Sequence, residues 1–226
     1  MPLSECLLEA VVKSGIQLEP QDILAVTQKI VSKAEGRIVH LSTVEPSSYS
    51  AAIARRMKKD PRLVEVILRE SKRIVRQRGE VLICETQHGF ICANAGVDQS
   101  NVEGDGTVTL LPKDPDRSAR SLSHALGCGI IVTDTFGRTW REGLVDVVIG
   151  IAGVPLFIDF RGQHDVYGLP LHATLLAAAD SLAAAAGLVM GKTSKTPAAL
   201  IRGFPWEATQ SNVEKMLRVP DKNLFL

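Results

Sequence analysis

Apolar residues recur along the chain in two rhythms, one typical of helices and one typical of strands. Helical spacing predicts helices over residues 3–12, 47–58, 116–126 and 171–190. A further helix is expected to begin at Asp60-Pro61, because Asp can cap a helix and Pro fits its first turn. Its apolar face should carry Leu63, Ile67 and Ile74.

Short apolar runs between polar turns predict the strands. They cover residues 23–31, 38–39, 81–84, 90–93, 129–134, 145–153, 155–160 and 198–202. The runs 81–84 and 90–93 flank a hairpin turn in which Gly89 can take a positive φ. Because strands occur both in hairpins and singly between helices, the pattern favours an α+β fold with mixed and antiparallel sheets. We expect one domain over residues 1–226, long enough to form two lobes.

The composition narrows the class of protein. The chain has 226 residues, of which 45% are hydrophobic and 23% charged, as in an ordinary globular protein. A net charge of +1 and only 4% aromatic residues argue against a nucleic-acid partner. The most apolar segment, 171–190, contains Asp180 and fits a buried helix better than a membrane span. With no signal-peptide pattern at the N-terminus, we expect a cytoplasmic protein without membrane contacts.

The cysteines show no metal-binding spacing. Cys6, Cys84, Cys92 and Cys128 form no CxxC pair, which disfavours a zinc site. Cys84 and Cys92 could face each other across the predicted hairpin, and we interpret them as small buried thiols.

The first polar stretch that could carry chemistry follows the strand at 23–31. Residues 27–37, TQKIVSKAEGR, bring Lys29, Lys33 and Arg37 into one turn region, and Gly36 lets backbone approach a ligand. A solvated turn without a ligand is the structural alternative.

The second stretch is NAGVDQSN, residues 94–101, directly after a predicted strand. Asp98, Ser100 and the two asparagines offer oxygen ligands suited to Mg²⁺ or Mn²⁺. A turn rich in Asn and Asp that binds nothing explains the same residues.

The third stretch, residues 133–143, resembles a functional site more than any other segment. Asp134 and Thr135 are expected at the end of a buried strand, where a carboxylate and a hydroxyl can hold a metal ion. Arg138 and Arg141 can bind phosphate or carboxylate through paired hydrogen bonds. Salt bridges from these arginines to the nearby Glu142 or Asp146 are the structural alternative.

Two partial nucleotide-binding motifs carry little weight. Residues 134–137, DTFG, match the DxxG pattern of GTPases in only two fixed letters. Residues 187–193, GLVMGKT, are one residue short of a P-loop and follow a long helix, so we expect these glycines to end that helix. Residues 192–196 could still line an anion site of another kind.

In this order, these stretches resemble one enzyme family. The chain is similar to the CofE-type coenzyme F-420-0:L-glutamate ligases, which add glutamate to a deazaflavin coenzyme. The similarity covers roughly residues 20–205 and is carried by KIVSKAEGR (29–37), NAGVDQSN (94–101), LLPKDPDRSA (110–119), IIVTDTFGRTWREG (130–143), IGIAGV (149–154), DVYG (165–168) and IRG (201–203).

The resemblance implies a role for each matching residue. Asp98, Asp134 and Thr135 take the positions of ligands in a site for two Mg²⁺ or Mn²⁺ ions, with K⁺ as a further cation. The nucleotide-binding positions are Gln28, Lys29, Lys33, Asn101, Gly191, Lys192, Thr193, Ser194, Lys195 and Thr196. Arg138 and Arg141 are our catalytic candidates, because they can bind phosphate and carboxylate oxygens.

The reaction that the resemblance implies forms an amide bond. GTP phosphorylates the terminal carboxylate of F-420-0, the amine of L-glutamate displaces the phosphate, and a second glutamate can follow through a γ-linkage. Family members form intertwined homodimers, so we expect a homodimer here. A γ-glutamyl ligase for another acid, such as a folate, and a non-catalytic nucleotide- or flavin-binding homologue stay open as alternatives.

The chain departs from the family pattern at three places. A strand and a GLP loop precede the first helix in the family, whereas Met1 falls within that helix here. Gln28 stands where some members carry Ser or Thr, and Lys192 where some carry Glu. Because base recognition needs matched polar groups, the change at the N-terminus predicts weak GTP binding with a blunted preference over ATP.

Overall fold

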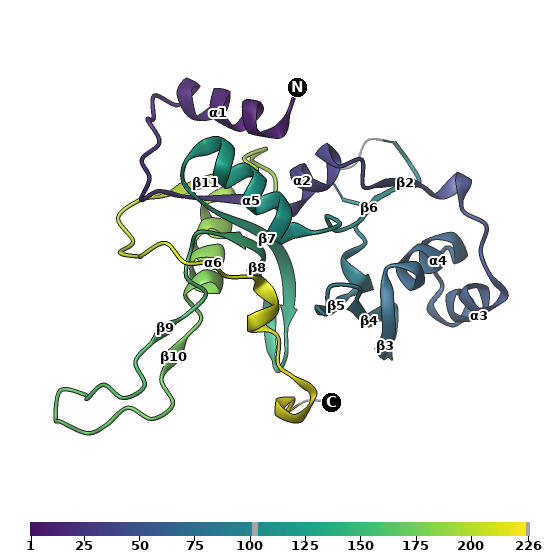
Figure 1. The fold of residues 1–226 in the computed structure, drawn as a ribbon. Helices are drawn as coiled ribbons and strands as arrows, with labels where there is room; N and C mark the ends of the chain where they lie inside the picture. The colour runs from purple at the N-terminus through teal and green to yellow at the C-terminus, as the bar shows by residue number, and fades with distance from the viewer. Residues whose placement is uncertain (101–103, 225–226) are drawn as a thin grey trace. The chain divides into compact units, whose positions relative to one another are not determined.

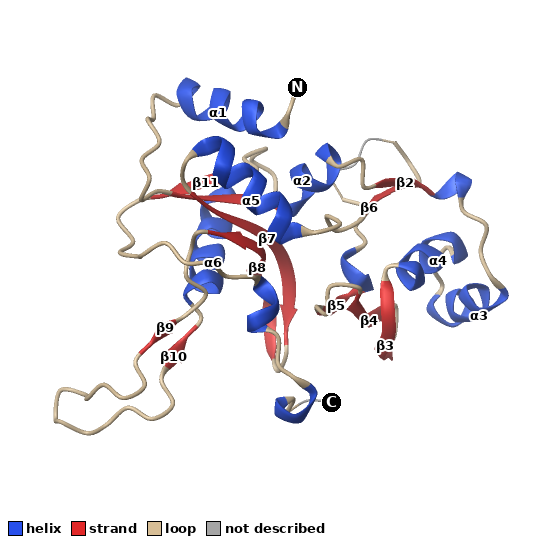
Figure 2. Cartoon of the chain, in the orientation of Figure 1, coloured by secondary structure: helices blue, strands red, loops and turns tan. Residues whose placement is uncertain are grey.

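The computed structural model describes residues 1–100 and 104–224 and divides the chain into two compact units (Figures 1 and 2). Unit 1 consists of Met1–Thr27, Pro115–Thr135 and Val145–Met216. Unit 2 consists of Gln28–Asp114, Phe136–Leu144 and the residues from Leu217 on. Each unit is thus assembled from segments that lie far apart in the sequence.

Unit 1 is built on a mixed four-stranded sheet with the order β11-β1-β7-β8. Its strands are β1 (Ile23–Thr27), β7 (Gly129–Arg138), β8 (Arg141–Ala152) and β11 (Ala198–Ile201). β1 pairs parallel with β7 and antiparallel with β11. Ile23–Val26 and Ile130–Val132 are fully or almost fully buried, which explains why these strands read as continuous apolar runs.

Three helices accompany this sheet: α1 (Leu3–Lys13), α5 (Pro115–Leu126) and α6 (Ala178–Met190). α1 packs on α5, and α6 packs on β11 and β1. Helix carboxylates bind two N–H groups of the edge strand β8: Asp180 accepts from Val148 at 2.9 Å, and Asp116 accepts from Ile151 at 2.8 Å. These two N–H groups are therefore satisfied within the unit and are not open to pairing with another strand.

An arm extends from the sheet and helices of unit 1 (Figure 1). It contains the short antiparallel strands β9 (Ile158–Asp159) and β10 (Leu175–Leu176) and the segment between them. Val166 and Tyr167 in that segment are 93% and 86% exposed.

Unit 2 combines two small antiparallel sheets with three helices. Its elements are α2 (Gln28–Ala34), β2 (Ile38–His40), α3 (Ser48–Met57), α4 (Pro61–Arg69), β3 (Ser71–Arg78), β4 (Val81–Thr86), β5 (Ile91–Ala93) and β6 (Thr107–Thr109). The sheet orders are β3-β4-β5 and β2-β6. α3 and α4 pack together, and Met57, Val64, Ile67 and Leu82 are buried in the unit's core.

Four short 3₁₀ turns complete the described structure: η1 (Leu41–Thr43), η2 (Asn94–Gly96), η3 (Val213–Met216) and η4 (Pro220–Lys222). Within the described residues, no helix combines the length and apolar character needed to cross a bilayer.

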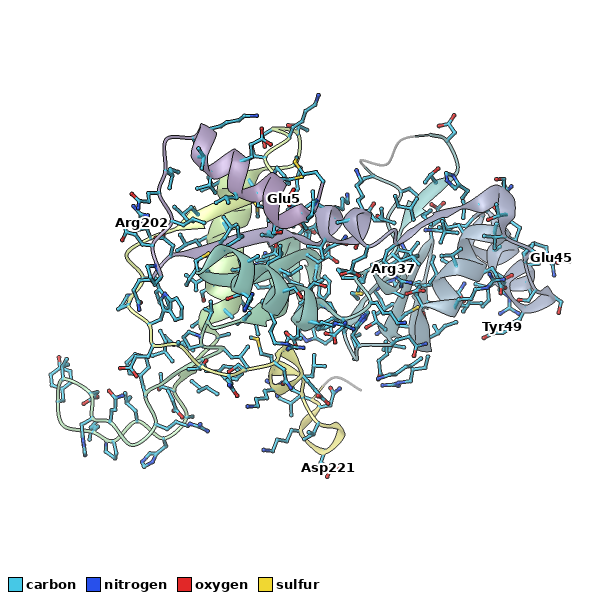
Figure 3. All side chains as sticks on the ribbon, turned by 45° about the horizontal axis from the view of Figure 1, so that its top comes forward. Glu5, Arg37, Glu45, Tyr49, Arg202 and Asp221 are labelled. Atoms are coloured by element: carbon cyan, nitrogen blue, oxygen red, sulfur yellow. The ribbon has the colours of Figure 1, made fainter. Side chains whose placement is uncertain are left out.

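In each unit an arginine forms an ion pair with a buried or partly buried carboxylate, and Figure 3 labels both arginines, Arg202 and Arg37. In unit 1, Arg202 donates to both oxygens of the buried Asp22 at 2.7 Å. In unit 2, Arg37 donates to Glu70 at 2.6 Å and to the carbonyl of Leu111 at 2.9 Å. Paired donation by arginine fixes geometry more strongly than a single ion pair does.

The α+β class is confirmed, while several predicted boundaries are wrong. The strand predicted at 23–31 ends at Thr27, and α2 begins at Gln28 because Gln, Lys and Ala are good helix formers. The helix that begins at Pro61 ends at Arg69, and Ile74 lies in β3 opposite Cys84. A two-strand hairpin offers Ile74 the same burial that a helix face would.

Three further elements differ from their predicted bounds. The helix predicted at 171–190 begins only at Ala178, because Leu175–Leu176 pair with β9. The strand predicted at 155–160 is reduced to Ile158–Asp159. The segment 133–143, expected beyond a strand end, forms the continuous β7-β8 hairpin.

The predicted hairpin of the cysteines is confirmed. Cys84 on β4 lies opposite Cys92 on β5, and both are buried free thiols. Gly89 in the turn has φ +95°. Burial raises the pKa of the Cys84 thiol, which keeps it protonated and unreactive.

Candidate functional site

Lys29, Asp98 and Ser100 form a closed polar network in unit 2. Lys29 comes from the first turn of α2, and its Nζ atom lies 2.8 Å from Oδ2 of Asp98 and also donates to the Ser100 hydroxyl. The Ser100 N–H donates to Oδ1 of Asp98 at 2.7 Å. The structure therefore brings together two of the predicted site residues, Lys29 and Asp98.

The network keeps Asp98 ionised. Burial raises the pKa of the Asp98 carboxyl, but the hydrogen bond from Lys29 and the N–H of Ser100 outweigh burial and hold the pKa below its usual value. An anionic carboxylate of this kind can bind a cation or hold an ammonium group.

A strained turn leads into Asp98. Asn94, Ala95 and Gly96 all have positive φ, at +52°, +53° and +73°. A Cβ on Gly96 would lie 2.6 Å from Leu111, so only glycine fits there. An Ala in the left-handed region is costly, and such strain is concentrated at functional sites. The turn and the buried Val97 together fix the start of the segment that carries Asp98.

The other predicted nucleotide residues of unit 2 differ in their surroundings. Gln28 is 2% exposed, and its Oε1 accepts from the Ser32 hydroxyl at 2.8 Å, so its side chain is bonded within α2. Lys33 lies in the last turn of the same helix. Asn101 lies outside the described residues.

A second polar cluster in unit 1 consists of Thr135, Asp146 and Lys192. Oδ1 of Asp146 accepts from the Thr135 hydroxyl at 2.5 Å and from Nζ of Lys192 at 2.9 Å, and that Nζ lies 2.6 Å from the Thr135 oxygen. The side chain of Asp146 is 6% exposed, against 62% for Lys192. From the sequence, Asp146 is expected only as a salt-bridge partner of Arg138 or Arg141 and not as a site residue. A lone acidic residue in the apolar run VDVVIGIA was the available signal.

Asp134 and Thr135 are neighbours in β7, inside unit 1. Successive residues of a strand point to opposite faces, so Asp134 does not share the face of the Thr135 hydroxyl. Thr133, on the same face as Thr135, has a buried hydroxyl without a partner among the described residues.

The two arginines of the hairpin lie at its exposed end. Arg138 donates to the main-chain carbonyls of Glu142 and Gly143. Arg141 begins β8 and is exposed. The structural alternative for Arg138 was a salt bridge to a carboxylate, whereas its guanidinium donates to backbone carbonyls instead.

The loop after α6 begins at Gly191, whose φ of +62° ends the helix as predicted, whereas Gly187, also expected at the helix end, lies inside α6. The Ser194 hydroxyl donates to the Met190 carbonyl, and Lys195 has φ +56°. Thr196 closes the loop with a hydrogen bond to the Ser194 carbonyl. The predicted nucleotide-binding residues 191–196 thus form one exposed loop, and Lys192 in this loop belongs to the cluster of Thr135 and Asp146.

The donor set fits a hard divalent cation in type. Carboxylate and hydroxyl oxygens are the preferred ligands of Mg²⁺ and Mn²⁺. Both Asp98 and Asp146 already hold a cationic group, the ammonium of Lys29 or Lys192. In the part of the chain that the structure describes, no three His, Cys, Asp or Glu side chains gather into a metal-binding group.

Carboxylates able to hold cations, next to lysines able to hold phosphate, are typical of enzymes that handle phosphorylated substrates. A family described as F420-0:Gamma-glutamyl ligase matches residues 2–203 of the chain. The chain belongs to this family.

Curated relatives match almost the whole chain. The Coenzyme F420:L-glutamate ligase of Methanothermobacter thermautotrophicus is 45% identical over 97% of this chain and 90% of the relative. That of Methanopyrus kandleri is 44% identical over 96% and 90%. That of Archaeoglobus fulgidus is 36% identical over 96% and 89%.

Proposed function

We propose that this protein is a ligase that joins L-glutamate to coenzyme F-420-0 through an amide bond. Family membership carries the proposal. The family match covers residues 2–203, and two relatives named Coenzyme F420:L-glutamate ligase are 45% and 44% identical over nearly the whole chain. The motifs from residue 29 to residue 203 resemble the same family and imply the same reaction.

Amide formation needs an activated acid, because a carboxylate does not react with an amine near neutral pH. In the proposed reaction, the γ-phosphoryl group of GTP is transferred to the terminal carboxylate of F-420-0. The α-amine of L-glutamate then attacks the acyl carbon and phosphate leaves. A second glutamate follows through a γ-linkage. Catalysis of phosphoryl transfer rests mainly on positioning and charge, which lysines and arginines can supply.

Each polar group has a proposed task. Lys29, Lys33 and Lys192 bind the phosphates, and Arg138 and Arg141 bind phosphate and carboxylate oxygens during transfer. Asp98 in unit 2 and Asp134 in unit 1 would each be a ligand of Mg²⁺ or Mn²⁺, and Thr135 would be a further ligand. When bound, these ions offset the anionic charge that brings carboxylate and triphosphate together.

We also propose that the protein acts as a homodimer. The arm of unit 1 exposes Val166, Tyr167 and Leu169, with exposed fractions of 93%, 86% and 64%. On α6, Leu188 and Val189 are 88% and 76% exposed. Apolar surface of this extent is stabilised when a second copy covers it.

Product analysis tests the proposed function. The protein is incubated with F-420-0, GTP, L-glutamate and Mn²⁺, and the products are weighed by mass spectrometry. We expect masses with one and two added glutamates. Parallel reactions with ATP and with a folate as acceptor test the nucleotide and the acid. Absence of any glutamylated F-420-0 would reject the proposal.

Two substitutions test the metal residues in the same assay. Asp98→Ala and Asp134→Ala should each abolish product formation while the circular-dichroism spectrum is retained. Glu9→Ala on the exposed face of α1 is the control and should leave product formation unchanged. Activity near that of the unmodified protein in either aspartate variant would contradict the metal assignment.

A further inference from the structure

Asp146 is a buried carboxylate on β8 that carries an exposed lysine. Its side chain is 6% exposed, yet its Oδ1 atom holds both the Nζ of Lys192 and the Thr135 hydroxyl. Lysine side chains have many rotamers, and an unrestrained one spends little time in any single position. The contact with Asp146 therefore selects one position for the Lys192 ammonium.

A glycine in α6 makes room for this carboxylate. A Cβ added at Gly187 would lie 2.3 Å from Oδ2 and 2.7 Å from Cγ of Asp146. Gly187 has ordinary helical geometry and no positive φ, so its conformation alone does not require glycine. The close approach of Asp146 is the physical reason for a glycine in the middle of this helix.

Helix α6 is itself fixed on the same strand. Asp180, seven residues before Gly187, accepts a hydrogen bond from the backbone N–H of Val148 on β8 at 2.9 Å. Thus the Asp180 carboxylate of α6 accepts a hydrogen bond from β8, and the Asp146 carboxylate of β8 packs against Gly187 of α6. These reciprocal contacts hold the start of the loop that carries Lys192 relative to Thr135.

We propose that Asp146 is a positioning residue, seated on Gly187, that presents the Lys192 ammonium as a fixed cation to the polyphosphate of the nucleotide. The inference rests on the proposed function for the identity of the anion, and it adds two residues, Asp146 and Gly187, to the site. The geometry is that of a cation bound by carboxylate and hydroxyl oxygens, with the cation supplied by the chain itself.

The direction in which Asp146→Asn changes polyphosphate affinity distinguishes positioning of Lys192 from a simple charge effect. Asp146→Asn removes a negative charge near the anion, which by Coulomb's law alone should tighten polyphosphate binding. If Asp146 positions Lys192, the same change should weaken binding. Gly187→Ala displaces the carboxylate without altering any charge, so the two variants test the inference by different routes.

The experiment measures binding of inorganic tripolyphosphate and of GTP by calorimetry, with EDTA present so that no divalent cation contributes. Lys192→Met should weaken binding about tenfold or more, the usual worth of a charge-assisted hydrogen bond. Asp146→Asn and Gly187→Ala should each weaken it about three- to tenfold, roughly the worth of an ordinary hydrogen bond, because the ammonium remains but is no longer held in place. Adding either change to Lys192→Met should cause less than about a twofold further loss, because all act through one ammonium.

Matched controls separate positioning from general damage. Gly137→Ala places a methyl group where nothing lies within 4 Å, and Lys13→Met with Glu9→Gln removes an exposed pair on α1. These variants should bind tripolyphosphate as the unmodified protein does. Circular dichroism checks the fold of each variant, and Asp146→Asn, which keeps the side-chain volume, remains the test if Gly187→Ala does not fold.

Several results would overturn the inference. They are unchanged or tighter binding by Asp146→Asn, losses that add fully to that of Lys192→Met, and failure of the unmodified protein to bind tripolyphosphate. The proposed function is judged separately by product mass. Coupled binding without glutamylated product would leave the inference standing and reject the function, whereas product formation with uncoupled binding would do the reverse.

Discussion

The Nζ atom of Lys29 lies 2.8 Å from Oδ2 of Asp98, within a network that Ser100 closes. A divalent cation that binds Asp98 must compete with this ammonium for the same carboxylate. Two cations at contact distance repel each other, so metal binding should release Lys29. The released ammonium is then available to a phosphate group.

This competition predicts opposite effects of Lys29→Met on two ligands. Mn²⁺ should bind the free protein about three- to tenfold more tightly, because a competing charge is gone. GTP should bind more weakly, because a phosphate contact is lost. Electron paramagnetic resonance measures free Mn²⁺, and calorimetry measures GTP. Lys13→Met is the control, and equal Mn²⁺ affinity in both variants would refute competition at Asp98.

Gly150 should tolerate no side chain. A Cβ there would lie 2.5 Å from the carbonyl carbon and oxygen of Pro115, which are backbone atoms at the start of α5 and cannot rotate away. Overpacking of this kind costs about 1–3 kcal/mol or more, so Gly150→Ala should lower the melting temperature by roughly 3–10 °C. Gly137→Ala, in open space, is the control. Melting temperatures that agree within 1–2 °C, roughly the effect of a few tenths of a kcal/mol, would contradict this account.

Asp22 should make unit 1 sensitive to acid. Hydrogen bonds from Arg202 lower the pKa of the Asp22 carboxyl below its usual 3.8, so the ionised form stabilises the fold. Its contribution is complete above the unfolded-state pKa near 3.8 and is lost as pH falls through the lower folded-state value. Asp22→Asn should cost about 2 kcal/mol at pH 7, reduced from the fully buried case because Arg202 is half-exposed.

Urea denaturation at several pH values checks this expectation. The stability difference between the unmodified protein and Asp22→Asn should be constant from pH 7 to about pH 5 and shrink below about pH 4. Lys13→Met, which breaks an exposed pair, should show almost no difference at any pH. A difference that persists undiminished at low pH would exclude ionisation of Asp22 as its origin.

Sequence patterns predicted the elements whose local signals agree. Asp60 caps α4 as predicted, with Pro61 at its first position, and Gly191 ends α6. In contrast, Ile74 follows Ile67 by seven residues, which is helical spacing, yet pairing with β4 places it in a strand opposite Cys84. Long-range pairing is invisible to local patterns, which is why boundaries shifted where strands met.

The candidate site was predictable to a different degree in each unit. The type and spacing of residues identified Lys29 and Asp98, which do lie together. The sequence suggested Asp146 only as a partner of the hairpin arginines, because its contact with Lys192 depends on the approach of α6 to β8, through Gly187, from a distant part of the sequence. The glycine inside α6 and the acidic residue inside β8 are explained only by their contact with each other in the fold.

The arm predicts how the protein assembles. Burying an apolar side chain such as Val or Leu is worth about 1.5–3 kcal/mol, and the arm exposes Val166, Tyr167 and Leu169 by 93%, 86% and 64%. Light scattering at micromolar concentration should therefore give about twice the chain mass of 24.4 kDa. Val166→Asp combined with Tyr167→Ser should shift the protein toward the monomer mass, because a buried charge opposes association. Val12→Ser, at an exposed apolar position on α1, is the control and should stay dimeric. A monomeric unmodified protein would reject the dimer, and a dimer unaffected by the arm variant would move the interface elsewhere.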